Sequence, residues 1–354
     1  KNNINFDISN IYIISFIFII NLVLSIVIAS NLTLGWDADF RWIMKALNFV
    51  QDNNVDNLQT FTDNEYPFLG SLVWGYFWKN SLLGYEYFGR LYYLYIFIIS
   101  IYTLSDVLKT SLNYKISIAL IVIFLVFKYS HFNGYQDVLI FSAVCLITKF
   151  IFYDLLNKNK RPNTDNFHII ILILLFNSIF WIKQEGMIYS LFFLILYFVY
   201  SKNLKYNIIL FFSTFLIFIL KYLIYENLNL PFIIQGETYN KSLTDFDLNT
   251  LISRFFIITK YYFIFIFDNL IMIINFISLC LIFIYQKNLK ILKLFILFFL
   301  LNTSFIYGSH LLMNLQNLDY WIKYSIGRFI FHTSGFYLLA FFIICNIRLA
   351  KFLK

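Results

Sequence analysis

The sequence predicts an all-α membrane protein: a polytopic bundle of about ten transmembrane helices, with amphipathic surface helices in its first outer loop. Of the 354 residues, 60% are hydrophobic and 22% aromatic, whereas only 13% are charged. Soluble domains carry about a quarter charged residues. The apolar runs recur along the chain, and many approach the ~20 residues with which an α-helix crosses a bilayer.

The hydrophobic runs define ten expected spans. The first run is longer than a signal-peptide core, so we expect it to persist as a helix. Polar turns at 128–137 and 182–187 are expected to join neighbouring runs as tight hairpins. The expected spans are residues 11–30, 91–108, 116–128, 138–153, 167–182, 187–200, 206–225, 263–285, 294–308 and 329–347.

The charges in the connections orient these spans. The amino terminus, the even-numbered connections and the carboxyl tail hold 14 Lys or Arg against 4 acids, whereas the odd-numbered connections hold 11 against 14. Because Lys and Arg concentrate on the cytoplasmic side of membrane proteins, both termini are expected in the cytoplasm. This distribution also explains the net charge of +8 without a nucleic-acid partner. Cys145, Cys280 and Cys345 fall within apolar runs and indicate neither a disulfide framework nor a metal site.

The orientation places residues 31–90, the largest connection, on the outer face. In "ADFRWIMKALNFV", Phe40, Met44 and Leu47 recur at helical spacing, which predicts an amphipathic helix on the bilayer surface. "TLISRFFIITKYYF", residues 250–263, resembles a second surface helix. We expect residues 1–354 to form a single transmembrane domain without a separate soluble domain.

Four polar clusters interrupt the apolar runs at positions that the topology places on the same outer face. Charged groups in or near lipid are costly and mark functional sites. The clusters come from distant parts of the sequence, so their common depth predicts one composite site. They contain Asp37 and Asp39, then His131, Tyr135 and Asp137, then Lys183 and Glu185, and finally Arg328 and His332, the last two expected at the start of the final span.

These residue types suit group transfer from a lipid-linked phosphate. A carboxylate can take a proton from a hydroxyl nucleophile. Arg, Lys and His can hold a phosphate leaving group, Arg with a forked donor geometry.

Five segments resemble, in order, the polytopic glycosyltransferases of the GT-C fold, especially bacterial enzymes that use polyprenyl-phosphate sugars. They lie between residues 35 and 340 and together make up about a fifth of the chain. "GWDADFRWIMKAL" resembles the acidic start of the family's first outer loop, and "NEYPFLGSLVWGYFW" a later Tyr-Pro segment. The others are "NGYQDVLIFSAVCLI", "WIKQEGMIYSLFFLILY" and "GRFIFHTSGFYLL".

The resemblance implies transfer of a sugar with inversion to an extracytoplasmic glycan, lipid or protein. It implies Asp37 as the catalytic general base with Asp39 second, and it leaves open a divalent cation, magnesium or manganese, held by these two acids. Lys183, Arg328 and His332 are the expected contacts of the donor phosphate. The remaining substrate-binding candidates are Glu65, Tyr66, Tyr135, Asp137 and Glu185.

Structural roles and other functions remain open at this stage. Asp37 and Asp39 could cap a surface helix, Lys183 and Glu185 could pair only with each other, and Arg328 could reach lipid headgroups. A surface-polysaccharide polymerase or ligase also has many spans with outer cations, but its large loop usually comes late in the chain. A lipid or glycan transporter or flippase would place its charges near the bilayer midplane, and it would contain a cavity that passes through the membrane.

Overall fold

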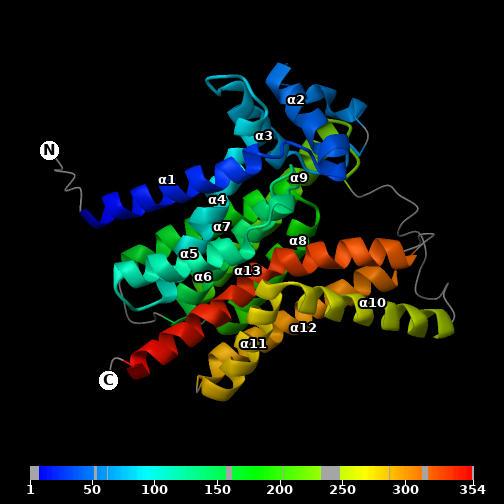
Figure 1. The fold of residues 1–354 in the computed structure, drawn as a ribbon. Helices are drawn as coiled ribbons and strands as arrows, with labels where there is room; N and C mark the ends of the chain where they lie inside the picture. Colours follow the sequence, from blue (N-terminus) through cyan, green and yellow to red (C-terminus); the bar gives the residue numbers. More distant parts are fainter. Residues whose placement is uncertain are drawn as a thin grey trace.

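The computed structural model of the chain describes residues 8–51, 54–61, 63–156, 162–201, 203–232, 248–286, 288–312 and 318–352. Within these residues the fold is helical and contains no strand (Figure 1). The helices are α1 (Ile8–Ala29), α2 (Ile43–Gln51), α3 (Leu69–Lys79), α4 (Tyr87–Leu104), α5 (Leu112–Val126), α6 (Asp137–Leu156), α7 (Pro162–Ile182), α8 (Glu185–Tyr200), α9 (Leu204–Asn227), α10 (Leu248–Asp268), α11 (Leu270–Tyr285), α12 (Leu289–Leu311) and α13 (Leu318–Phe352). A short π-helix, Ala38–Trp42, precedes α2, and 3-10 turns lie at Asp56–Thr60, Ser105–Val107 and Tyr129–His131.

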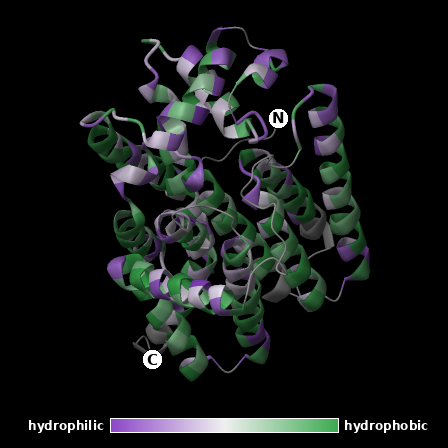
Figure 2. Cartoon of the chain, turned by 90° about the vertical axis from the view of Figure 1, so that its right-hand side faces the viewer, coloured by the Kyte–Doolittle hydropathy of each residue, from purple (hydrophilic) through white to green (hydrophobic). Residues whose placement is uncertain are grey.

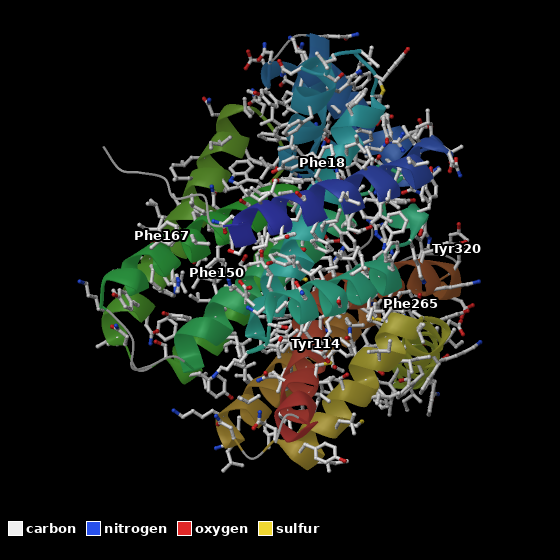
Figure 3. All side chains as sticks on the ribbon, turned by 60° about the vertical axis from the view of Figure 1, so that its left-hand side comes forward. Phe18, Tyr114, Phe150, Phe167, Phe265 and Tyr320 are labelled. Atoms are coloured by element: carbon white, nitrogen blue, oxygen red, sulfur yellow. The ribbon has the colours of Figure 1, made fainter. Side chains whose placement is uncertain are left out.

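Six helices in the described part of the chain are long and apolar enough to cross a membrane: α1, α4, α9, α10, α12 and α13. Four shorter apolar helices, α5, α7, α8 and α11, accompany them. The chain is therefore a multi-pass membrane protein. Figure 3 shows Phe18, Phe167 and Tyr320 on the outside of the bundle, where more than half of each side chain is exposed. Such an apolar exterior is expected of helices that contact lipid.

The expected span at 263–285 is wrong as a single helix. The chain is extended at Asn269, which separates α10 from α11. The Asn269 carbonyl accepts from the amides of Met272 and Ile273, while its side chain donates to the Phe265 carbonyl and accepts from Lys128. Asn269 therefore ends one helix and begins the next. The surface helix expected at 250–263 forms part of α10, which is also long and apolar enough to span, so its position at the surface stays a prediction.

The last helix is longer than the expected span at 329–347. α13 has 35 residues and begins at Leu318. At 1.5 Å per residue it extends about 52 Å, well beyond the ~30 Å hydrocarbon core of a bilayer. Arg328 therefore lies inside a helix, and not at its start. α13 packs against α6, α10 and α11, and crosses the centre of the bundle (Figure 1).

The first loop folds as a helical unit, α2 and α3, that lies at the top of Figures 1 and 2. This unit carries many of the hydrophilic turns in Figure 2, whereas the helices below it are mostly hydrophobic. The apolar residues Phe40 and Met44 are exposed, while Lys45 and Asn48 are buried against the protein. Trp42, Ala46 and Phe49 are buried on the same side, so the inward side of this segment is both polar and apolar, and of its apolar residues only Phe40 and Met44 remain exposed.

Close helix packing at the turn between α7 and α8 requires a glycine. A Cβ atom built on Gly186 would lie 2.0 Å from the backbone oxygen of Ile179. The two helices could not approach this closely with any side chain at this position. The turn therefore has a fixed geometry, and it carries Lys183 and Glu185.

We expect Gly186→Ala to lower the free energy of unfolding by about 1–3 kcal/mol, the usual cost of overpacking. Gly308→Ala is the control, since a Cβ there meets no atom within 4 Å. Alanine has a higher helix propensity, so this variant should unfold at the wild-type temperature or above it. Equal stability of the two variants, measured by thermal unfolding in detergent, would contradict the close approach.

Candidate functional site

The central contact of the candidate site joins the first loop to the last helix, α13. Asp37 lies at the start of the first-loop unit, and Arg328 lies in α13, 291 positions later. The Nη1 atom of Arg328 donates to Oδ2 of Asp37 over 2.7 Å. Asp37 is 6% exposed, so this ion pair is largely shielded from solvent.

A second carboxylate, Asp137 at the first residue of α6, gathers the remaining cations. Lys183 donates to its Oδ1 over 2.5 Å. The Nε2 atom of His332 lies 2.6 Å from the same oxygen, and Nε of Arg328 lies 3.2 Å from Oδ2. Arg328 thus bridges the two carboxylates. Since Lys183 is 1% exposed and His332 fully buried, Asp137 supplies the negative charge that makes their burial tolerable.

The tautomer of His332 follows from its neighbours. Ionised Asp137 can only accept, so Nε2 carries a hydrogen. The Nδ1 atom of His332 lies 3.2 Å from the Tyr189 hydroxyl. A neutral imidazole accepts from this hydroxyl, whereas an imidazolium donates to it. Tyr189 therefore fixes the ring plane in either protonation state.

A tight connection between α5 and α6 brings Tyr135 next to Arg328. The amide of Gly35 donates to the Asn133 carbonyl over 2.8 Å, and a Cβ on Gly35 would lie 2.3 Å from the Tyr135 ring. Gly134 adopts a φ of +94°, which few other residues tolerate. The Tyr135 ring lies 5.6 Å from the Arg328 guanidinium carbon, within cation–π range. Burial raises the pKa of Tyr135, so its hydroxyl stays protonated.

A second arginine, which the sequence analysis did not assign to the site, closes it on the loop side. The Nη1 atom of Arg41 lies 3.4 Å from Oδ1 of Asp37, and its Nε donates to Asp63 over 2.6 Å. Its guanidinium also faces the Tyr66 ring at 5.0 Å. In the sequence, the spacing of four residues between Asp37 and Arg41, which places both on one helical face, could have indicated this contact.

Lys45 fixes the turn that holds Asp63 and Tyr66. Its amine donates to the backbone carbonyls of both residues, over 2.9 Å each. This contact stabilises Asp63 at a positive φ of 56°. Arg41 is therefore held by a turn that Lys45 organises from inside the loop.

The other expected site residues lie outside the ion pairs described above. Asp39 is exposed and lies outside the cluster. Glu65 is buried, and its carbonyl accepts from the Gln184 side chain over 3.1 Å, which joins the first loop to the α7–α8 turn. Glu185 begins α8, and its Oε2 is buried without a hydrogen-bond partner among the described residues. Asp268, expected inside a span, is exposed at the end of α10.

The carboxylate expected to hold a metal ion is already surrounded by cationic side chains. Each oxygen of Asp37 faces a guanidinium. In the part of the chain that the structure describes, His, Cys, Asp and Glu form no group of three that could hold a metal ion. The divalent cation at Asp37 and Asp39 stays a prediction.

Comparison with protein-family models, with curated proteins and with solved structures finds no match for this chain.

We expect Asp137→Asn to cost about 3–5 kcal/mol of unfolding free energy, because it leaves Lys183 and Arg328 facing a neutral amide in a buried site. The control is Asp106→Asn, which breaks two ion pairs around a 42% exposed carboxylate, to Lys115 and Lys149. Exposed pairs contribute about 0–1 kcal/mol. Equal losses in the two variants, measured by denaturant titration, would show that the Asp137 cluster is not a buried ion network.

Lys45 predicts a pH dependence of stability. Burial lowers its pKa to about 8, against 10.5 in the unfolded chain. The unfolded state then binds more protons between pH 8 and 10.5, so the contribution of Lys45 to unfolding free energy rises across this window. The free energy of unfolding of wild type minus that of Lys45→Met should therefore rise between pH 8 and 10.5, by an amount on the order of 3 kcal/mol.

The control for this pH series is Lys79→Met, which removes an exposed lysine at the end of α3. Its difference from wild type should stay constant from pH 8 to 10.5. A constant difference for Lys45→Met as well would mean that the amine is not held in a desolvated site.

Proposed function

We propose that the chain is an integral membrane glycosyltransferase of the GT-C type. It transfers a sugar from a polyprenyl-phosphate donor to an extracytoplasmic acceptor, with inversion at the anomeric carbon. In this proposal the chain crosses the membrane an even number of times with both termini in the cytoplasm, and the site opens on the outer face. The observation that carries the proposal is the 2.7 Å contact between Asp37 and Arg328. It brings a carboxylate of the first loop and a cation of the last helix into one site.

The charge balance of the site explains how a phosphate would bind. Arg328 contacts both Asp37 and Asp137, and its side chain is 35% exposed. A donor phosphate competes with Asp37 for Nη1 of Arg328, because both are anions that accept from the same guanidinium. Asp137 keeps its contact with Nε and holds the side chain in place. Lys183 and His332 supply further donors close to the same position.

Displacement of Asp37 prepares the general base. Once the phosphate takes Nη1, Oδ2 of Asp37 is released and can accept the hydroxyl proton of the acceptor. The acceptor oxygen then forms a bond to the anomeric carbon, while the bond between that carbon and the phosphate oxygen breaks. The phosphate leaves with its charge held by Arg328 and Lys183. Attack from the face opposite the leaving group inverts the anomeric configuration.

Asp137 is poorly suited to serve as this base. Three donors surround its two oxygens, and its removal from them would leave buried cations unpaired. Its role in the proposal is to position Arg328, Lys183 and His332. Glu65, Tyr66, Tyr135 and Glu185 surround the cluster and remain the candidates for binding the sugar and its acceptor.

We expect Asp37→Asn to lower the rate of sugar transfer by about 10²–10⁴-fold, the usual contribution of a positioned general base. The assay uses membranes that contain the protein, with labelled polyprenyl-phosphate sugars. Asparagine keeps the shape and a hydrogen-bond acceptor for Arg328, but it removes a buried charge that faces two guanidinium groups, so stability should fall as well and the rate is compared per amount of folded protein.

Asp56→Asn is the matched control, since it changes an exposed acid of the same loop. It should transfer sugar at the wild-type rate. Full activity of Asp37→Asn would reject Asp37 as the base. A wild type inactive with every polyprenyl-phosphate sugar, together with a cavity that passes through the membrane, would favour a transporter.

A further inference from the structure

A third buried lysine lies apart from the candidate site, near the carboxyl end of an apolar helix. Lys221 of α9 is 1% exposed. Its amine donates to the backbone carbonyl of Phe180 over 2.8 Å. The rings of Trp181, Tyr225 and Phe232 surround it with centroids at 5.8, 5.4 and 5.9 Å. Among the described residues no carboxylate lies within 4 Å of the amine, and Glu185 acts on it only at longer range.

This environment leaves the ammonium group incompletely compensated. It has three hydrogens, but the structure gives it one oxygen acceptor and the Met187 sulfur at 4.0 Å. Aromatic faces offer partial compensation. A cation in an apolar helix is costly unless it is paired or serves a ligand.

A second unpaired polar group lies one helical turn away. Tyr225 is fully buried, and its hydroxyl has no hydrogen-bond partner among the described residues. Residues four positions apart are neighbours on a helix surface. Lys221 and Tyr225 thus present two incompletely used donors on one side of α9.

An apolar groove lies beside Lys221, which reaches it through its contacts with Phe180 and Met187, while neither Lys221 nor Tyr225 is itself among the lining residues. The groove lies between α7, α8 and α9, with a volume of about 190 Å³. Phe180 and Met187, which contact the Lys221 amine, also line the groove, and Phe218 lines it one turn before Lys221. The groove is open to the side, because Leu191, Phe211 and Phe215 on its walls are 46–54% exposed. The full lining is Phe180, Met187, Leu191, Leu194, Phe211, Thr214, Phe215 and Phe218.

We propose that this groove binds one aliphatic chain of an anionic amphiphile, with its head on Lys221 and Tyr225. The apolar walls take the chain, and the two donors take a phosphate or carboxylate oxygen. The volume is below the 300–1,000 Å³ typical of small-molecule pockets, so it fits part of a single chain. The surrounding bilayer supplies such ligands. The proposal does not rest on the proposed transferase activity, although Glu185, a candidate residue of the other site, acts electrostatically on Lys221.

The test uses the purified full chain in phosphatidylcholine nanodiscs, without any sugar donor. We measure the binding of dodecyl phosphate and laurate, with dodecanol as the uncharged probe of equal chain length. Both anions should bind more tightly than dodecanol, and the tighter of the two identifies the head group. Lys221→Met should weaken the binding of the anions at least tenfold and leave dodecanol unchanged.

Lys205→Met is the control, since it removes an exposed lysine from the same helix. It should bind all three probes like wild type. Equal binding of dodecyl phosphate by wild type and Lys221→Met, or equal affinity of wild type for the anions and dodecanol, would overturn the proposal.

Photolabelling of wild type with a diazirine-tailed alkyl phosphate tests the site even where Lys221→Met fails to fold. Labels should fall on the groove residues Leu191, Phe211 and Phe215, and excess dodecyl phosphate should suppress them. Labels confined to other helices would also overturn the proposal.

Discussion

The buried carboxylate of Asp137 is the constraint on which the polar interior of this bundle depends. It lies at the start of α6, where the helix dipole favours a negative charge, and it receives Lys183 from the α7–α8 turn together with Arg328 and His332 from α13. Each of these groups would be costly in an apolar interior without it. A shift of one helical turn in α13 would move its two side chains by about 5.4 Å and break both contacts. The network therefore fixes how α6, α8 and α13 lie against one another.

Arg328 extends this constraint to the first loop. One edge of its guanidinium contacts Asp137 and the other contacts Asp37. The loop is held on its own side by Arg41 and by the turn that Lys45 organises. Any anion that binds Arg328 must therefore compete with a carboxylate of the loop, while the carboxylate of α6 keeps the arginine in position. This asymmetry between a firmly held Asp137 and a replaceable contact at Asp37 suits a site that binds a phosphate and releases a base in one event.

The sequence predicted the helical membrane architecture and the residues of the cluster, because ionisable groups are rare in apolar runs and must find one another there. It could not predict the helix ends. Asn269, where α10 ends and α11 begins, contacts Lys128 141 positions away, and the first ten residues of α13 are too polar to resemble a span. The burial of Lys45 and Asn48 beside Ala46 and Phe49 was also hidden, since periodicity does not show which polar groups find partners inside the protein. Lys221 was overlooked because one lysine in a long apolar run is easily explained by snorkelling.

The three buried lysines show how far their environments differ. Lys183 faces a carboxylate, so its charge is neutralised within the protein. Lys45 has no carboxylate within 4 Å in the described residues, but two carbonyls accept from it and acids of the loop lie nearby. Lys221 has one carbonyl and three aromatic rings. Compensation by direct contacts therefore decreases along this series, although Glu185 of the α7–α8 turn also acts electrostatically on Lys221. A lysine that serves only packing could be replaced by methionine at a gain in stability. Its presence beside an unpaired tyrosine and an open groove is best explained by an anion that the membrane, and not the chain, provides.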